Sequence, residues 1–243
     1  MNSQMLFGIV LTAFPVLLSL TLHEFGHARA ALAFGDDTAR LMGRVSLNPL
    51  VHLDVIGTLG LFFGPIGWAK PVPVNVANLH PRRWGSFCVS IAGVSMNLLL
   101  AGAAVVTLNI LGASGFSIGP DATAPTPGAV LVLMLYVLLL TNLSLMVFNL
   151  IPLAPLDGHR ALGEMLPREA QSGYWSFQQR MGMPILIGIV ALGFLSRHGG
   201  PGINPLRLLM RYTVFPMLDM ALTQSAGDLL GTTLDRFGGY LLW

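Results

Sequence analysis

The run His23-Glu24-Phe25-Gly26-His27 has the pattern H-E-x-x-H, in which two metal-binding side chains stand on either side of an acid. On a helix, residues four apart lie on one face, so His23 and His27 can bind the same metal ion. Glu24 projects beside them, where its carboxylate can take a proton from a water that the ion holds. The flanking residues are mostly apolar, and the two histidines and the glutamate are costly to bury there without partners. The run therefore predicts a metal site with hydrolytic chemistry.

A third ligand is needed, because a zinc site that also holds a water usually has three protein ligands. The candidate is Asp157, which follows the apolar run 129–151 and the prolines Pro152 and Pro155. These prolines break a helix, and a membrane tolerates such a break only where it lines a cavity or is covered by protein. Taken by itself, Asp157 could merely cap the helix that begins near Gly158. Together with the H-E-x-x-H run, it is predicted to be the third ligand.

The composition indicates that the elements carrying these residues cross a membrane. The chain has 243 residues, of which 53% are hydrophobic and 10% are charged, and its mean hydropathy is +0.69. A soluble domain has about 25% charged residues, so part of this surface must face lipid. The hydrophobicity excludes a disordered chain, and the single cysteine excludes a disulfide scaffold. With 13 basic and 11 acidic residues and no long basic cluster, nucleic-acid binding is not supported.

We expect an all-α polytopic membrane protein with about four to six transmembrane helices. The clear apolar spans are Met5–Leu22 (continuing as a helix to Phe34), Trp84–Leu111, Ala129–Ile151 and the short Met183–Leu195. A weaker candidate, Asn204–Leu222, carries Arg207, Arg211 and Asp219 and suits an interfacial helix equally well. No basic cluster precedes the first span and no cleavage site follows it, so we interpret it as a retained helix.

Between the first two spans, the sequence predicts two less regular features. The stretch Val55–Ala69 is apolar but short and rich in glycine, which favours a re-entrant segment over a straight span. Pro71–Asn75 alternates as an edge strand does, and Gly43–Leu47 could supply a pairing strand. We therefore expect a small interfacial β element beside the re-entrant segment.

The distribution of basic residues predicts the orientation of the chain. Lysine and arginine gather in the stretches 28–83 and 154–180, whereas the loop 112–128 contains neither. By the positive-inside rule, the N-terminus is outside and residues 35–83 and 154–181 are cytoplasmic. We expect residues 1–196 to form one core domain and residues 197–243 to form further interfacial or transmembrane helices.

These motifs resemble the site-2 protease family of intramembrane zinc metalloproteases. The family's second mark, an N-x-x-P-x-x-x-L-D-G-like motif, stands here as Asn149-Leu-Ile-Pro-Leu-Ala-Pro-Leu-Asp157-Gly158. Further stretches, such as Gly67–Asn75 and the run from Ala92-Gly93 to Asn97, look like bacterial members without a PDZ domain. One departure is Val94 where the family usually has proline, which concerns helix geometry and not the ligands.

The resemblance implies a role for each matched residue. His23, His27 and Asp157 match the zinc ligands, and Glu24 matches the catalytic residue. It further implies Zn²⁺ as cofactor, a membrane-spanning helix as substrate, and a bacterial inner membrane as location, with the active site toward the cytoplasm. The expected partners are thus the substrate helix and the lipid bilayer, with no nucleic acid; the oligomeric state is not indicated.

Several other polar residues have competing interpretations. Asn149 could donate a hydrogen bond to a developing oxyanion, or it could serve in packing between helices. Asn142 lies on the same face, and Asn97 is interpreted as a packing residue. His52 could approach the site, but we interpret it as a structural residue. His159 should point away from the site if it is helical.

A second class of function is a non-proteolytic zinc protein, either a transporter or an inactive scaffold. A transporter needs polar groups in both halves of the membrane, and the outer halves of these spans have few. An inactive scaffold has no need of Glu24. Proteolysis is therefore the favoured prediction.

Overall fold

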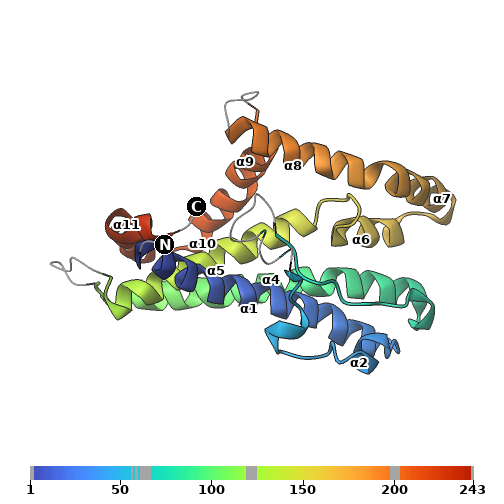
Figure 1. The fold of residues 1–243 in the computed structure, drawn as a ribbon, viewed down its shortest axis with the longest axis horizontal. Coiled ribbons are helices and arrows are strands. Elements are labelled where there is room, and N and C mark those ends of the chain that lie inside the picture. The colour runs from blue at the N-terminus through green and yellow to red at the C-terminus, as the bar shows by residue number, and fades with distance from the viewer. Residues whose placement is uncertain are drawn as a thin grey trace.

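Three long helices form the centre of the molecule in the computed structural model, which describes residues 3–55, 57, 60, 67–118, 125–197 and 203–241. They are α1 (Ser3–Ala33), α4 (Arg82–Ala113) and α5 (Pro127–Asn149), and they run side by side (Figure 1). Their facing sides bury a continuous apolar core that includes Leu108, Val132 and Leu133, all fully buried. Burial of such side chains is what holds these helices at a defined rotation about their axes.

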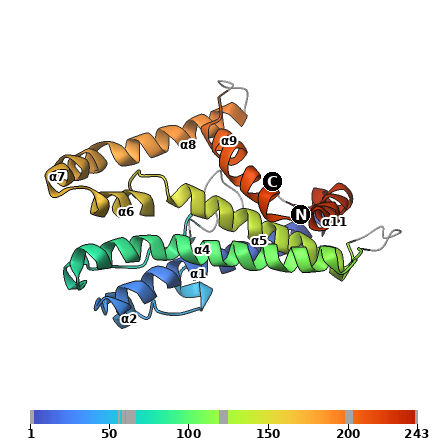
Figure 2. The same cartoon turned by 180° about the vertical axis from the view of Figure 1, so that it is seen from behind.

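The remaining elements lie around this bundle of α1, α4 and α5. At one end are α2 (Thr38–Leu41), η1 (Pro49–Val51), η2 (Val76–Asn78), α6 (Asp157–Met165) and α7 (Arg168–Phe177). The chain then continues through a π-turn, η3 (Gln178–Gly182), into α8 (Met183–Arg197), and later forms α9 (Pro205–Leu209), η4 (Met210–Val214), α10 (Phe215–Ala221), α11 (Gln224–Phe237) and η5 (Gly238–Tyr240). Seen from behind, α11 lies at the end of the bundle that also holds the N-terminus (Figure 2).

Four helical runs in the described parts of the chain are long and apolar enough to cross a membrane, which confirms a polytopic all-α architecture there. They are Phe7–Ala33, Arg82–Ala113, Pro127–Asn149 and Arg168–Ser196. The first three correspond to the predicted spans. The fourth was predicted as the short span Met183–Leu195, but the helix reaches back to Arg168 because α7, η3 and α8 are continuous.

The weaker candidate span, Asn204–Leu222, is not among these four runs. There the chain is helical from Pro205 to Ala221, through the π-turn η4, and α11 begins after Leu222 and Thr223. The side chain of Asn109 on α4 binds this region, donating to the Ala221 carbonyl at 3.1 Å and accepting from the Thr223 N–H at 2.9 Å. A Cβ atom on Gly112 would lie 2.8 Å from Cα of Ala226, so α11 packs directly on the end of α4.

The expected strand pair is absent from the described residues. Gly43 forms a turn with a φ of +67°, and the segment 71–75 is extended but belongs to no sheet. Pro71 and Pro73 have no N–H to donate along one edge of this segment, and the Val72 N–H between them is bound by Glu24 and not by a second strand. Arg44 instead holds the two stretches together, with its guanidinium donating to the Lys70 carbonyl at 2.5 Å and to that of Pro71. Most of the predicted re-entrant segment lies outside the described residues.

A buried carboxylate closes this end of the molecule. Asp36, fully buried just beyond α1, accepts hydrogen bonds from the backbone and hydroxyl of Thr38, from the Asn75 N–H and from the Asn78 amide. Burial acts to raise the pKa of Asp36, but these hydrogen bonds outweigh it and hold the pKa below its ordinary value. They also anchor the segment 70–76 beside the C-terminal part of α1.

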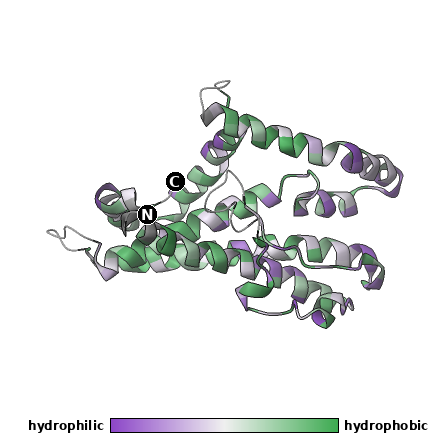
Figure 3. Cartoon of the chain, viewed as in Figure 1, coloured by the Kyte–Doolittle hydropathy of each residue, from purple (hydrophilic) through white to green (hydrophobic). Residues whose placement is uncertain are grey.

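Hydrophobic residues predominate along the bundle, and hydrophilic residues gather toward its ends (Figure 3). Hydrophilic residues gather around α2, the start of α4 and the α6–α7 region, whereas the middle of α1, α4 and α5 is hydrophobic. This distribution is typical of a protein whose middle faces lipid and whose ends face water.

Candidate active site

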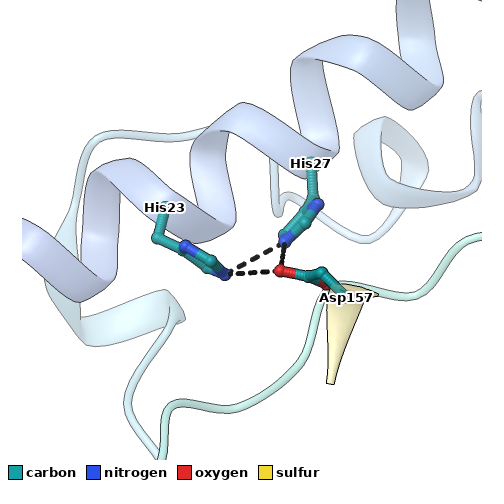
Figure 4. Close-up of side chains that lie close together, drawn as sticks. All are labelled: His23, His27 and Asp157. Atoms are coloured by element: carbon teal, nitrogen blue, oxygen red, sulfur yellow. Dashed lines mark hydrogen bonds and ion pairs between the residues drawn. The ribbon is translucent and has the colours of Figure 1, made fainter. Parts of the chain in front are cut away.

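His23, His27 and Asp157 converge on one point between α1 and the start of α6 (Figure 4). The Nε2 atoms of the two imidazoles are 3.1 Å apart. Oδ2 of Asp157 lies 3.2 Å from Nε2 of His23 and 3.3 Å from Nε2 of His27. Residues separated by some 130 positions in the sequence thus present three possible ligand atoms to one small volume.

A close crossing of α1 and α4 makes this convergence possible. A Cβ atom on Gly26 would lie 2.7 Å from Cγ of Met96 and 2.9 Å from the Ala92 carbonyl oxygen. A Cβ atom on Gly93 would lie 2.7 Å from Nε2 of His23 and closer still to that of His27. Because neither glycine has a side chain, α4 can approach α1 and its imidazoles closely.

The break after α5 brings Asp157 to the same point. α5 ends at Asn149, and the chain turns through residues 150–156 before α6 begins at Asp157. Gly158 permits the tight return, since a Cβ there would lie 2.7 Å from the Ile151 carbonyl oxygen. The N-cap of α6 is Leu156, so Asp157 is the first residue of the helix and not its cap. The capping explanation for Asp157 is therefore not supported, and its carboxylate points at the histidines.

The donor set fits a zinc ion. Bond lengths of about 2.0–2.1 Å in a tetrahedral site separate the ligand atoms by about 3.3–3.4 Å, close to the separations of 3.1, 3.2 and 3.3 Å observed here. Apart from the two imidazoles, no donor among the described residues reaches the buried Oδ2 of Asp157. Burial acts to raise the pKa of Asp157, but the hydrogen bonds with His23 and His27 outweigh it and lower the pKa, so the carboxylate is ionised as a ligand must be.

Glu24 faces the same cavity, which has a volume of about 340 Å³ and is lined in part by His23, His27 and Asp157. Its Oε2 accepts a hydrogen bond of 2.9 Å from the Val72 N–H. The segment 70–76, which is anchored through Asp36, therefore holds the carboxylate in the cavity beside the proposed ligands. A carboxylate that is fixed but still exposed to a cavity is suited to receive a proton from a reacting water.

Each histidine is oriented by a partner on α4. Nδ1 of His27 lies 2.7 Å from the Val89 carbonyl oxygen, and Nδ1 of His23 lies 2.6 Å from Oδ1 of Asn97. Sequence reasoning missed this contact of Asn97, which it interpreted as packing. The available signal was an amide side chain within the predicted span Trp84–Leu111, since a polar group inside a membrane needs a hydrogen-bonding partner.

The other polar candidates divide between the cavity and its surroundings. Asn149 lines the cavity, and its side-chain amide donates to the Leu145 carbonyl at 3.0 Å within α5. His52 is buried away from the cavity with Nε2 2.8 Å from the Ser46 carbonyl oxygen, in agreement with a structural role. His159 contacts the Leu156 carbonyl and lines a different hollow, so it points away from the ligands as expected.

Known proteins with similar sequences are named as zinc metalloproteases. "Putative zinc metalloprotease YwhC" from Bacillus subtilis is 40% identical over 152 residues, which cover 63% of this chain and 67% of the relative. "Putative zinc metalloprotease Rip2" from Mycolicibacterium smegmatis is 34% identical over 160 residues, which cover 64% of this chain and 57% of the relative. The matched residues thus cover only 57% to 67% of the length of these two relatives. The comparison with solved structures found no significant match to this chain.

The match to a family model extends further along the chain than any of these pairwise similarities. Residues 11–189 match the model of Peptidase family M50, and they include the H-E-x-x-H run, the break after α5 and the first part of α8. Since this match covers well over half of the 243 residues, the chain belongs to Peptidase family M50, the site-2 protease family.

Proposed function

We propose that this protein is an intramembrane zinc metalloprotease that hydrolyses peptide bonds of membrane-spanning helices near the cytoplasmic side. The observation that carries the proposal is the convergence of Nε2 of His23, Nε2 of His27 and Oδ2 of Asp157, with the Glu24 carboxylate in the same cavity. His23, His27 and Asp157 are the proposed ligands, and Glu24 is the proposed general base. Membership of Peptidase family M50 and the names of its relatives support the same conclusion.

The chemistry then divides between the metal and the side chains. Zinc, when bound, supplies a Lewis acid that polarises the peptide carbonyl, together with a water whose pKa it lowers. Glu24 would accept a proton from the attacking water and would deliver it to the leaving amide nitrogen. The hydrogen bond from the Val72 N–H holds the Glu24 carboxylate in the cavity that His23, His27 and Asp157 also line.

A helical substrate must unwind locally before it is cut, because its carbonyls are engaged in internal hydrogen bonds. Asn149 lies where it can assist the exposed carbonyl. Its Nδ2 has two hydrogens, and the bond to the Leu145 carbonyl uses one of them. The other can be donated to the oxyanion that develops on the substrate.

The alternative is a zinc protein without proteolytic activity. A transporter or a scaffold could use the same three ligands, but it has no use for a carboxylate held beside them. The Glu24 carboxylate, fixed by a backbone N–H and facing the cavity, therefore favours the protease.

The purified full chain in detergent or liposomes provides the test. We expect wild-type protein to bind one Zn²⁺ and to cleave members of a panel of tagged single-span peptides. Glu24→Gln should retain zinc and lose cleavage by about 10²–10⁴-fold, the usual contribution of a general base. Glu169→Gln, an exposed acid on α7, is the matched control and should behave as wild type. Retained zinc with no cleavage of any peptide by the wild type would favour the alternative.

The proposed orientation requires its own test. We infer a bacterial inner membrane, with the N-terminus outside and the site toward the cytoplasm, from the distribution of basic residues. In a variant with Cys88 replaced by alanine, cysteine can be placed singly at Ser114 or at Glu169. A membrane-impermeant maleimide added to intact bacterial cells should label position 114 and not position 169. The reverse pattern would invert the topology.

A further inference from the structure

A chain of buried hydrogen bonds runs from the first histidine across all three helices of the bundle. Oδ1 of Asn97 on α4 lies 2.6 Å from Nδ1 of His23, and Nδ2 of Asn97 donates to Oδ1 of Asn142 on α5 at 2.8 Å. Nδ2 of Asn142 donates to the hydroxyl of Ser19 at 2.7 Å, and that hydroxyl donates to the Pro15 carbonyl at 2.7 Å. Asn97, Asn142 and Ser19 are all fully buried.

The direction of every bond in this chain follows from its far end. A backbone carbonyl can only accept, so the Ser19 hydroxyl must donate to Pro15 and its oxygen is left to accept from Asn142. The same Nδ2 of Asn142 also donates to the Leu138 carbonyl at 2.7 Å, a second group that can only accept. The NH₂ end of Asn142 is thereby fixed, and its Oδ1 must face α4.

The orientation of Asn97 follows in the same way. Because Oδ1 of Asn142 can only accept, Asn97 must present its NH₂ group to α5 and its Oδ1 to His23. Oδ1 has no hydrogen to donate, so Nδ1 of His23 must carry the proton in this bond. The remaining nitrogen, Nε2, then has its lone pair free to bind a metal ion, and Nε2 is the atom that faces Asp157.

We infer that Asn97 is a positioning residue for the metal site, and that the relay Asn97–Asn142–Ser19 fixes both the tautomer and the ring orientation of His23. This inference rests on the proposed role of His23 as a zinc ligand. His27 reaches the same state by a shorter route, through the Val89 carbonyl. The two ligands on α1 are therefore oriented by different means, one by backbone and one by a replaceable side chain.

Zinc affinity of the purified full chain tests the inference, measured by competition with a chromogenic chelator. Asn97→Leu should weaken Zn²⁺ binding by about 10–100-fold, the usual cost of losing a partner of a ligand histidine. The matched control is Asn109→Leu, which also removes an amide that joins α4 to a neighbouring segment but lies outside the site. Both variants should lower the unfolding temperature of the metal-free protein, but only Asn97→Leu should lower zinc affinity.

A conservative variant separates positioning from packing. In Asn97→Asp, a carboxylate still accepts from Nδ1 of His23 but cannot donate to Asn142. We expect zinc affinity within about threefold of wild type, because carboxylates are common partners of ligand histidines, with a lowered unfolding temperature. If Asn97→Leu does not fold, Asn97→Asp still tests the inference, because a loss of zinc affinity well beyond threefold would contradict it.

Three results would overturn the inference: wild-type zinc affinity in Asn97→Leu, an equal loss in Asn109→Leu, or an equal loss in Asn97→Leu and Asn97→Asp. Failure of the proposed function is recognised separately. If wild-type protein does not bind zinc, or if His23→Ala binds it as tightly as wild type does, the ligand set itself is wrong.

Discussion

The bundle of α1, α4 and α5 and the run α7–α8 are all apolar over lengths that can cross a membrane, yet they are buried to very different extents. In the apolar stretch of 18 residues that could cross the membrane, half of α1 is buried within the protein. In the same stretch of α4 and of α5 the buried share is 39%. For Arg168–Ser196 the figure is 17%. Apolar side chains such as Ile187 and Leu195 are half-exposed or more along α8.

This difference in burial indicates which part of the protein can hold a metal site in a fixed geometry. The bundle buries the two histidines, the relay of Asn97, Asn142 and Ser19, and the crossing at Gly93. A site whose geometry must be kept within fractions of an ångström needs packed surroundings. The run α7–α8 carries none of the proposed ligands, and its apolar side chains are suited to contact lipid.

The run α7–α8 is nevertheless hydrogen-bonded to the segment that carries the third ligand. Gln178, buried in the π-turn, accepts from the Ala154 N–H at 2.9 Å and donates to the Pro152 carbonyl at 2.8 Å. The Tyr174 hydroxyl donates to the His159 carbonyl at 2.8 Å. These bonds lie on both sides of Asp157.

Shortening one leucine in each region should give the largest contrast in stability. Leu133 is fully buried in α5, so Leu133→Ala should lower the free energy of unfolding by about 3 kcal/mol through the cavity it leaves. Leu195 on α8 is 50% exposed, and Leu195→Ala should cost less than about 0.5 kcal/mol. Denaturant unfolding in detergent measures both. Equal losses would mean that α8 packs against something other than lipid or detergent.

Adding one methyl group to a glycine in each region should separate them in metal binding. Gly93→Ala places a Cβ against both imidazoles and should weaken zinc binding by about 100-fold, within the range seen for disturbed ligand surroundings. Gly188 on α8 has open space around it, so Gly188→Ala should bind zinc as wild type does. Chelator competition gives the comparison. Normal zinc affinity in Gly93→Ala would show that α4 does not approach the site as closely as described.

The hydrogen bonds of Asp36 beside the C-terminal end of α1 should make the free energy of unfolding depend on pH. Because the pKa of Asp36 is below its ordinary value of 3.8, its stabilising effect is present above that pH and is lost as the pH falls through the lowered pKa. Asp36→Asn should cost about 1–2 kcal/mol near neutrality, and this difference should shrink in acid. Unfolding temperatures of both proteins from pH 7 to pH 3 measure it. A difference that does not change with pH would contradict the assignment.

The smallest effect is expected where the two regions are joined. Gln178→Leu removes both bonds to the 152–154 turn and should weaken zinc binding by about two- to fivefold, because Asp157 then has more freedom. Gln171→Leu, which removes bonds to Gly163 and Leu166 farther along the chain, is the matched control. A loss in the control as large as that in Gln178→Leu would attribute the effect to general loosening of α7.

Hydropathy was enough to predict three of the four long helices, since each is an uninterrupted apolar run. The extension of α8 back through α7 was missed, because Arg168–Gly182 is polar enough to be interpreted as a loop. The strands at Gly43–Leu47 and Pro71–Asn75 were wrong because Gly43 forms a turn and because the Val72 N–H is bound by the side chain of Glu24. The sequence around Arg44 does not predict that its side chain will bind the carbonyls of Lys70 and Pro71.

For the site, spacing and resemblance were enough to select the residues that the structure brings together. His23 and His27 are neighbours through helix geometry alone, so their proximity was predictable. The role of Asn97 was not, because the rotation of α4 against α1 depends on packing along both helices. The same amide could have bound a backbone carbonyl or another helix.

The position of Asp157 in the sequence has a consequence for biosynthesis. His23, His27 and the groups that orient them, Val89 and Asn97, all belong to α1 and α4, the first two long helices to leave the ribosome. The third ligand and the bonds of Gln178 follow many residues later. During synthesis, a pair of histidines is therefore set in place before the site can be completed. A hydrolytic centre assembled in this order stays incomplete until residue 157 has been added.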